Sequence, residues 1–527
     1  MSEKSPTSTD PLASNTWDVV IIGTGMGGAT VGWALVQRGL SVLFLEKGTR
    51  HEAYRSAQAT ETPETRLAQG YWPHPMTLQR PDGSRHRFHA PVGCALGGSS
   101  IHYAGALERM AASDFEPLCT STNQTIRWPV AYGDFVPFYE DAESLYGIAR
   151  ESDMTRESRF SEWDRGLARA LRDKGLQAST CHVAMGYDVA CRECIGIICD
   201  RGCKVDARRA CLDLALQQPG CEILDNCDVQ LLEADERRVH AVRAIHHGRP
   251  IDIRARVVVL AAGGYHSPQL LLSSRNSLWP NGLANRSDQV GRNLMFHGVE
   301  LYALWAPRRL DRRGLARKAL SIRDFYVHDS MRLGMVQSMG LEAGRGNIAM
   351  ILKDSLRRRG LQNAFLLSLL VKVPSHVAEW LLGSAKIFAA TTEDDPHPDN
   401  RIVLDDSEPN GSSFTYTITD DLRDRANRLH RVFAEHAKPW RVVRLNQQLT
   451  VNYGHPCGTC RFGDDPVTSV LNRDCRSHEV ENLFVVDASF MPRSGAVNPS
   501  LTIAANALRV APKIAAAVAS SAAELRQ

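Results

Sequence analysis

A glycine-rich turn between two apolar strands is the feature that most constrains how this chain can fold. Residues 17–22 contain the β-branched run VVII, and the turn that follows has glycine at positions 23, 25 and 28. Residues 29–39 are typical of a helix that ends at a glycine, and a second apolar strand at 41–45 leads to Glu46. Strand, glycine turn, helix, strand and acid together form a βαβ unit. The pattern predicts a Rossmann-type, dinucleotide-binding start to an α/β fold.

Each residue of this unit has its own physical role. Gly23 allows the tight turn, Gly25 lets the backbone approach a pyrophosphate, and Gly28 lets the helix pack close to the strand. The pyrophosphate would sit on the unpaired N–H groups of the helix N-terminus, where the helix dipole favours negative charge. Glu46 follows Gly28 by 18 residues, where a carboxylate can accept hydrogen bonds from an adenosine ribose. The unit alone does not distinguish FAD from NAD.

Length and charge limit the remaining classes of protein. At about 100–200 residues per domain, a chain of 527 residues should contain two or three domains. Lys and Arg number 62 against 59 Asp and Glu, so the formal net charge is +3. This near balance argues against a nucleic-acid-binding protein, which needs a strongly basic face. Two local basic runs, 308–318 and 357–359, are expected to be solvated surface.

The ends and the apolar segments bear on location. Residues 1–16 are polar, lack the apolar core of a signal peptide and are expected to be disordered. The most apolar segment, 364–382, is interrupted by polar residues and proline, so it does not meet the requirement for a membrane span. A cytoplasmic protein is the expectation. Core packing is the simplest interpretation of residues 365–382, and a lid over a lipophilic substrate or a membrane-contacting helix are the alternatives.

Further segments carry a second set of signals. They are, in order, GGSSIH at 97–102, GYHSPQLL at 264–271, GRNL at 291–294 followed by His297, HPCGTC at 455–460, NLFVVD at 482–487 and NPSLT at 498–502. With the N-terminal βαβ unit, they resemble the signatures of the glucose–methanol–choline (GMC) family of FAD-dependent oxidoreductases. The resemblance extends over about residues 17–515.

The resemblance implies an α/β fold in which a Rossmann-type FAD-binding domain is interleaved with an α+β substrate domain built on an antiparallel sheet. The three parts of the FAD-binding domain are expected at 17–115, 191–298 and 451–527. The two parts of the substrate domain are expected at 116–190 and 299–450.

The resemblance also implies which residues contact FAD. They are Gly23, Gly25, Gly28, Glu46, Gly97, Gly98, Ser99, Ser100, His102, Val229, Ala262, Asp487 and Pro499. Asp487 ends a predicted strand, where its carboxylate can accept from ribityl or pyrophosphate-side hydroxyls, with a simple helix or turn cap as the alternative. Pro499 starts a helix expected over 499–518, whose N-terminal amides would face the flavin ring. Pro512 is expected to kink or split that helix.

Two residues are implied in catalysis. In the family an alcohol gives its proton to a histidine while its hydride goes to flavin N5, and His455 occupies the histidine's position. With an unperturbed pKa of about 6.5, a histidine provides a neutral base near neutral pH. Asn498 occupies the place of the second residue, which is His or Asn in the family. His102 matches the position where some members bind the flavin covalently, and packing against the flavin is the alternative. Tyr103 stands where many members have asparagine.

The cysteines form a local cluster. Eight of the 13 lie between positions 181 and 227. Cys191, Cys194, Cys199 and Cys203 have the short spacing of zinc or iron–sulfur ligands. The last three resemble the cysteines that hold an iron–sulfur cluster in bacterial sugar dehydrogenases of the family, although the proline that often follows the last of them is absent. Free thiols or local disulfides are the remaining interpretation.

The resemblance therefore predicts FAD-dependent oxidation of an alcohol, CH–OH to C=O, with a sugar, a glycoside or a lipophilic alcohol as substrate. Oxygen, a quinone or a redox protein would take the electrons. A lyase or photodecarboxylase on the same scaffold and a non-catalytic electron-transfer flavoprotein are the alternatives.

Overall fold

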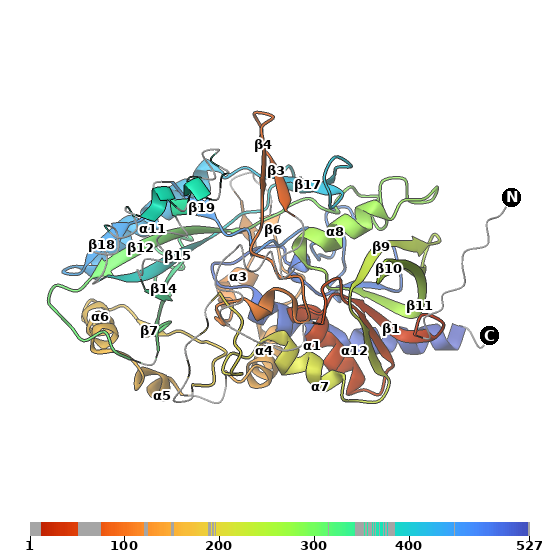
Figure 1. Ribbon diagram of the computed structural model, residues 1–527, viewed down its shortest axis with the longest axis horizontal. Coiled ribbons are helices and arrows are strands. Elements are labelled where there is room, and N and C mark those ends of the chain that lie inside the picture. Colours follow the sequence, from red (N-terminus) through yellow and green to blue (C-terminus); the bar gives the residue numbers. More distant parts are fainter. Residues whose placement is uncertain are drawn as a thin grey trace.

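Two large sheets occupy opposite halves of the computed structural model (Figure 1). The structure describes residues 12–50, 75–120, 125–148, 152–187, 191, 194, 196–314, 316–342, 385–446 and 448–524, with scattered positions between 352 and 377. Residues 1–11 of the expected disordered tail lie outside this range. Residues 12–15 form a turn, and the Trp17 indole N–H donates to the carbonyl of Leu12 at 3.0 Å.

The first sheet is built on five parallel strands. In sheet order they are β8 (Cys221–Leu224), β2 (Val42–Leu45), β1 (Thr16–Ile22), β11 (Arg249–Leu260) and β20 (Leu483–Val485). The antiparallel strands β10 (Val239–His246) and β9 (Cys227–Ala234) extend it from the first half of β11. β2, residues 19–22 of β1 and residues 257–260 of β11 are buried on both faces, which explains their continuous apolar sequences. The sheet brings together segments from both ends of the chain.

Helices from distant parts of the chain cover this sheet. They are α1 (Met26–Val36), α4 (Tyr132–Leu145), α8 (Gly263–Ser273) and α12 (Ser500–Glu524). α12 contacts both α1 and α4, and Tyr139 of α4 shares a 2.8 Å hydrogen bond with Thr502 of α12. α4 therefore packs in the core of the first sheet, although its sequence falls in the range 116–190 expected for the substrate domain.

Pro512 was expected to kink or split the last helix, and the split is wrong, because α12 continues through Pro512 to Glu524. A kink at Pro512 stays a prediction. Between residues 500 and 522, α12 is long and apolar enough to cross a membrane, but 72% of its most apolar window is buried inside the molecule.

The second sheet is antiparallel. Its main path is β18 (Arg441–Arg444), β12 (His297–Trp305), β15 (Lys386–Glu393), β14 (Met335–Glu342), β13 (Leu320–Ile322) and β7 (Ser179–Thr180), and β19 (Thr450–Val451) also pairs with β12. Side chains alternate between the two faces of such strands. Phe388 and Val336 pack under α6 (Glu162–Arg172) and α11 (Asp420–Ala437), whereas Ala389 and Gln337, one residue further on, face a large cavity.

The remaining elements are short. A four-stranded sheet contains β16 (Arg401–Leu404), β17 (Ser412–Thr415), β3 (Met76–Gln79) and β4 (Arg85–Phe88), and β5 (Leu118–Cys119) pairs with β6 (Thr125–Ile126). The short helices are η2 (Gly98–Ile101), α3 (Ala112–Phe115), α5 (Asp153–Glu157), η3 (Arg208–Leu212), α7 (Asp213–Ala215) and η4 (Ala488–Phe490).

The apolar stretch that begins at Phe365 is largely exposed where it is described. Phe365 is 78% exposed and Leu369 is 58% exposed, whereas Leu367 and Val371 are buried. Core packing is therefore the wrong interpretation for most of its described apolar side chains. Residues 378–382 lie outside the described residues.

Candidate active site

A cavity of about 930 Å³ lies where the parallel strands end and extends to the antiparallel sheet. Its wall includes most of the residues predicted from the sequence: Gly23, Gly25, Glu46, Gly98, Ser99, Ser100, His102, Val229, Ala262, His455, Asp487, Asn498 and Pro499. Gly28 and Gly97 lie behind the wall. The position at the carboxyl ends of parallel strands is the usual ligand site of α/β folds.

The glycine turn is tightly enclosed by backbone. Gly23 has φ +99°, and a Cβ atom there would lie 2.4 Å from the carbonyl oxygen of Ala261. A Cβ at Gly28 would lie 2.1 Å from the carbonyl oxygen of Gly23, and one at Gly98 would lie 2.8 Å from the Cα of Gly25. No other residue fits these three positions without moving the backbone. The two glycine-rich segments thus form one cradle at the edge of the cavity.

This cradle suits the diphosphate of a dinucleotide. Gly25 is the N-cap of α1 and has no side chain to occupy the first amides of the helix, so these N–H groups are available to an anion. The Glu46 carboxylate accepts from the backbone N–H and the hydroxyl of Thr24, at 3.0 and 2.6 Å, and from the N–H of Gly48 at 2.9 Å. Burial raises the pKa of Glu46. Glu46 thus braces the turn, and its contact with a ribose stays a prediction.

Asp487 joins two helix N-termini. Its Oδ2 accepts from the N–H of Gly263 at 2.9 Å and from the hydroxyl of Ser267, at the start of α8. Its Oδ1 accepts from the N–H and hydroxyl of Ser489, so Asp487 is the N-cap of η4. The structure therefore shows the capping role that the sequence left as an alternative. Its contact with cofactor hydroxyls stays a prediction.

His455 and Asn498 lie in the wall of the same cavity. Nδ1 of His455 is 3.1 Å from Nδ1 of His297, and its Nε2 is 3.2 Å from the amide nitrogen of Asn452. The Asn498 amide oxygen accepts from Nε2 of Gln337 at 3.2 Å. The predicted pair therefore belongs to a larger polar group drawn from β12, β14 and the C-terminal loops.

Both histidines are kept neutral. Burial, followed by the neighbouring His297 and Lys318, lowers the pKa of His455 well below the usual histidine value. Burial lowers the pKa of His297 to about 4. A neutral imidazole with a free ring nitrogen is the form that can accept a proton.

Sequence reasoning missed Lys318, Gln337 and Asn452 and gave His297 no role of its own. Lys318 is 3% exposed and lines the cavity, so the expectation of solvated surface for the run 308–318 is wrong at this residue. Gln337 shows no local signal beyond the strand alternation of β14. Asn452 stands three residues before His455, on the same loop.

His102 and Tyr103 follow η2 in the cavity wall. The Tyr103 hydroxyl donates to the carbonyl of Val205, and burial raises the pKa of Tyr103 well above its usual value. Tyr103 therefore packs as a neutral, hydrogen-bonded phenol. Covalent attachment of FAD through His102 stays a prediction.

The cysteine cluster lies behind Tyr103. Cys194, Cys199 and Cys203 are buried against one another, with Cys191 packed beside them. The buried Lys204 ammonium donates to the carbonyl of Tyr103 at 3.1 Å, which links the cluster to the cavity wall. The structure describes all 13 cysteines as thiols that are not joined in disulfides, so the cluster is not explained by local disulfides.

No group of three or more metal-ligating side chains in the described part of the chain has the geometry to hold a metal ion. The four cysteines, as they are arranged in the structure, do not fit a cluster.

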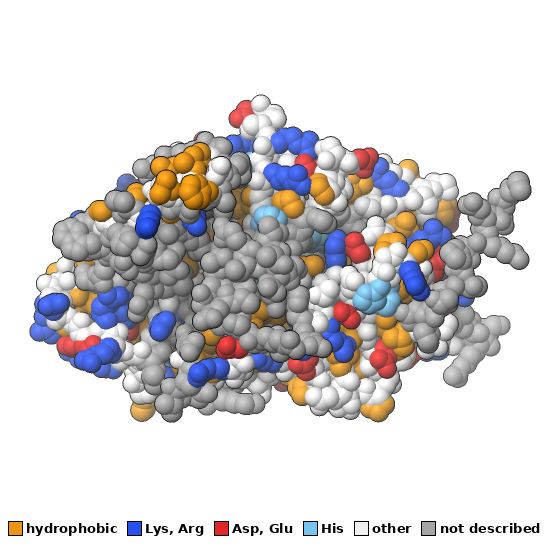
Figure 2. All heavy atoms as spheres, viewed as in Figure 1, with side chains coloured by type: hydrophobic (Ala, Val, Ile, Leu, Met, Phe, Trp, Pro, Cys, Tyr) orange, Lys and Arg blue, Asp and Glu red, His pale blue; other side chains and the backbone are white. Residues whose placement is uncertain are grey.

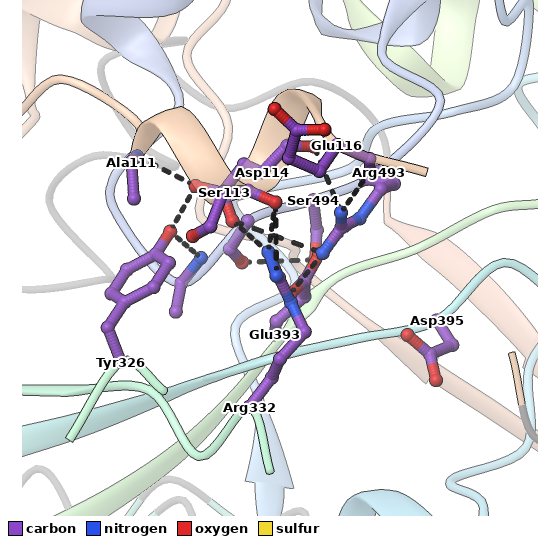
Figure 3. A network of polar contacts seen from close by, with 12 residues as sticks. Ala111, Ser113, Asp114, Glu116, Tyr326, Arg332, Glu393, Asp395, Arg493 and Ser494 are labelled. Atoms are coloured by element: carbon purple, nitrogen blue, oxygen red, sulfur yellow. Dashed lines mark hydrogen bonds and ion pairs between the residues drawn. The ribbon is translucent and has the colours of Figure 1, made fainter. Parts of the chain in front are cut away.

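A buried ionic network fixes the loop that leads to Asn498 (Figure 3). Arg493 donates from Nε and Nη2 to the two carboxylate oxygens of Glu393, both at 2.9 Å. Arg332 bridges Glu393 and Asp114, and the Tyr326 hydroxyl donates to Asp114 at 2.6 Å. The same hydroxyl accepts from the N–H of Ala496 at 2.8 Å. The network thereby holds residues 493–496 against β15 and α3.

The fold and the cavity define a dinucleotide-binding oxidoreductase with an antiparallel-sheet domain over its ligand edge. Models of the GMC oxidoreductase family match residues 17–299 and 396–507. The chain belongs to the GMC oxidoreductase family. It is an FAD-binding α/β enzyme that acts on CH–OH groups, with a Rossmann-type domain interleaved with an α+β domain.

Comparison with individual proteins supports this family assignment. The 6'''-hydroxyparomomycin C oxidase of Streptomyces lividus is 29% identical, over 96% of this chain and 93% of that protein. The 2-methyl-1,2-propanediol dehydrogenase of Mycolicibacterium austroafricanum is 27% identical, over 93% and 94%. The crystal structure of pyridoxine 4-oxidase from Mesorbium loti superposes with a TM-score of 0.66 at 19% identity, over 95% of this chain and 99% of that one. The relatives thus include oxidases and a dehydrogenase.

Proposed function

We propose that this enzyme oxidises a neutral alcohol that carries several polar groups, with His455 as the base and Asn498 as the residue that holds the substrate oxygen. The observation that carries the proposal is the neutral, half-buried His455, which lines the same cavity as Asn498. FAD, when bound, supplies the acceptor for the carbinol hydride at its N5 atom.

The protein residues act on the proton and the oxygen. Neutral His455 accepts the hydroxyl proton, which leaves the electron pair on the substrate oxygen to drive hydride loss. Asn498 is oriented by Gln337, which donates to its Oδ1. The Asn498 amide N–H is therefore directed away from Gln337 and is available to donate to the substrate oxygen.

The cavity wall near His455 supports a polar substrate rather than a lipophilic one. Lys318, Gln337, Thr391 and Asn452 contribute polar side chains, while Val299, Met339 and Ala389 contribute apolar ones. By their names, two relatives given above act on 6'''-hydroxyparomomycin C and on 2-methyl-1,2-propanediol. The Lys318 ammonium disfavours a cationic aminoglycoside, so we favour a neutral sugar, glycoside or diol.

Anaerobic flavin reduction tests the proposal. The FAD-loaded protein is mixed with neutral sugars, glycosides, diols, fatty alcohols and aminoglycosides, and bleaching of the flavin absorbance is followed. Neutral polyols should bleach the flavin, and His455→Ala should slow bleaching by about 10²–10⁴-fold while keeping the oxidised flavin spectrum.

Three outcomes contradict the proposal. Bleaching by fatty alcohols or aminoglycosides alone would reject the substrate class. Turnover that depends on light or cyanide without bleaching would favour a decarboxylase or a lyase. No reaction with any compound would favour an electron-transfer module.

A second measurement identifies the class of electron acceptor. The bleached protein is mixed with air or with a soluble quinone, and the compound that reoxidises the flavin, if either does, indicates the class.

We also propose that the enzyme contacts a membrane surface through residues 365–377. Figure 2 shows hydrophobic side chains gathered at the upper left, where Figure 1 draws this segment beside α11. Leu366, Leu369, Leu370 and Val377 are between 40% and 58% exposed. Lys372 is exposed within the segment, and three arginines precede it at 357–359. An exposed apolar face that includes the basic side chain of Lys372 suits an anionic lipid surface.

A further inference from the structure

His297 lies beside the proposed base and is completely buried. The two imidazole rings are nearly perpendicular, at 89°, with centroids 5.1 Å apart, and their Nδ1 atoms are separated by 3.1 Å. Two Nδ1 atoms at hydrogen-bond distance cannot both carry a proton or both lack one. One histidine must therefore donate to the other, and the remaining contacts of each ring decide which one donates.

The two histidines belong to a row of four hydrogen-bonded groups, which runs from the Ser494 carbonyl through His297 and His455 to the Asn452 amide. The Ser494 carbonyl is at one end of this row. Nε2 of His297 lies 3.2 Å from the carbonyl oxygen of Ser494. A carbonyl oxygen only accepts hydrogen bonds, so this nitrogen carries a proton. Because burial lowers the pKa of His297 to about 4, the ring is neutral and has one proton in total. Nδ1 of His297 is therefore the acceptor and Nδ1 of His455 is the donor.

The Asn452 amide is at the other end of the row, and it independently indicates the same donor and acceptor nitrogens. The Asn452 amide oxygen accepts from the backbone N–H of Gly454 at 3.0 Å, which turns the amide nitrogen toward His455. An amide nitrogen only donates, so Nε2 of His455 is an acceptor. All three contacts are satisfied when the protons point from Asn452 through His455 and His297 to Ser494.

We propose that His297 is a positioning residue that fixes the tautomer of His455, with the proton on Nδ1 and the lone pair on Nε2. This inference rests on the proposed role of His455 as the base. Nε2 is then the nitrogen that takes the hydroxyl proton, and the substrate oxygen takes the place of the Asn452 amide. As His455 becomes charged, its Nδ1–H remains bonded to His297, which stabilises the imidazolium.

The surrounding structure fixes this acceptor in space. His297 begins β12 and pairs with Glu393 of β15. The Ser494 hydroxyl donates to the carbonyl of Asp394 at 3.0 Å and accepts from its N–H at 2.9 Å. Next to it, Arg493 is clamped by Glu393 (Figure 3). The carbonyl that sets the proton on His297 is therefore part of a buried loop that hydrogen bonds and an ion pair hold in place.

Two substitutions separate this role from a merely structural one. In His297→Gln, the amide nitrogen can donate to Ser494 and the amide oxygen can accept from His455, so the polarity of the chain of bonds is kept. In His297→Leu both contacts are lost, and the two tautomers of His455 compete. We expect His297→Gln to keep kcat within about 3-fold and His297→Leu to lower kcat by about 10–100-fold with little change in KM, a loss within the range of general base catalysis.

Nitrogen-15 NMR of histidine-labelled, FAD-loaded protein reads the tautomer without any substrate. His455, assigned by its loss in His455→Ala, should show a protonated Nδ1 and an unprotonated Nε2 in the parent protein and in His297→Gln, and a mixture in His297→Leu. A protonated Nε2 in the parent protein, or equal spectra and rates in the Gln and Leu variants, would overturn the inference.

The spectra of the parent protein and of His297→Gln decide the matter even if His297→Leu does not fold. If no alcohol bleaches the flavin, the proposed function fails while the tautomer assignment is still tested. The two proposals can therefore fail separately.

Discussion

Lys318 lines the same cavity as His455. Its ammonium is one of the groups that lower the pKa of His455, and it is buried in the cavity wall. Lys318→Met removes the charge and keeps most of the volume, so the pKa of His455 should rise. Because only neutral His455 accepts a proton, the acidic limb of kcat/KM against pH should move to higher pH.

The exposed neighbour Arg317 provides the matched control. Arg317→Met also removes one positive charge, but water screens its field. Its pH profile should match that of the parent protein. An unchanged profile in Lys318→Met, or equal shifts in both variants, would show that Lys318 does not act on the base.

Single residues differ in how well the sequence predicts them. His455 and Asn498 were found because they stand in the motifs HPCGTC and NPSLT. The first motif precedes β20 and the second leads into α12. Lys318 was assigned to the surface because it ends a basic run, and a charge pattern does not show which member turns inward. Gln337 was missed because its exposure to the cavity depends on how β14 pairs with β15.

At the scale of elements, the proposed membrane contact can be tested by substituting exposed apolar residues of the segment 365–377. The double variant Leu369→Ser/Leu370→Ser removes exposed apolar side chains without touching the cavity. The parent protein should sediment with anionic phosphatidylglycerol vesicles and bind phosphatidylcholine vesicles less, and the double variant should sediment severalfold less with either. Flavin content and alcohol-dependent bleaching should be unchanged.

Val467, which is 68% exposed, offers the matched control. Val467→Ser should sediment like the parent protein. Absence of sedimentation by the parent protein, or an equal loss in both variants, contradicts contact through this segment. Concentration-dependent self-association that the double variant abolishes would instead identify a second copy of the chain as the partner.

Elements with strong local signals were predicted closely. β1 and β2 begin and end within one residue of the predicted strands, because both are largely buried and their apolar runs are continuous. α12 continues through Pro512 because its packing against α1 and α4 outweighs the lost backbone hydrogen bond. The exposure of Leu369 was not predicted, because apolar character does not distinguish a core segment from a docking surface.

At the scale of the whole molecule, the family resemblance implied the interleaved fold, in which both ends of the chain carry parts of the nucleotide-binding unit. The sequence did not show that α4 packs with α12, because that contact joins residues more than 350 positions apart. It also gave no indication of the network of Asp114, Arg332, Glu393 and Arg493, whose members come from four separate segments. Pairings at such distances along the chain leave no local pattern.

That network should also govern how acid affects the stability of the molecule. Burial alone would raise the pKa of Glu393, but Arg493 and Arg332 outweigh it and lower the pKa to about 2. A carboxyl whose pKa is lower in the folded state stabilises the fold above its unfolded pKa of about 4.5. This contribution is lost as the pH falls from about 4.5 toward 2. At pH 7, Glu393→Gln leaves two buried arginines facing Asp114 alone, which should reduce the free energy of unfolding by about 3–5 kcal/mol.

Urea unfolding of the FAD-loaded protein at pH 7, 5 and 3 measures this effect. The difference between the parent protein and Glu393→Gln should be largest at pH 7 and should shrink at pH 3, because the parent protein itself loses the contribution there. Glu435→Gln, which removes an exposed carboxylate paired with Lys438 at 2.7 Å, should change stability little at any pH. If the loss of unfolding free energy in Glu393→Gln does not vary with pH, the effect comes from packing. It would then not come from the negative charge of Glu393 that Arg332 and Arg493 contact.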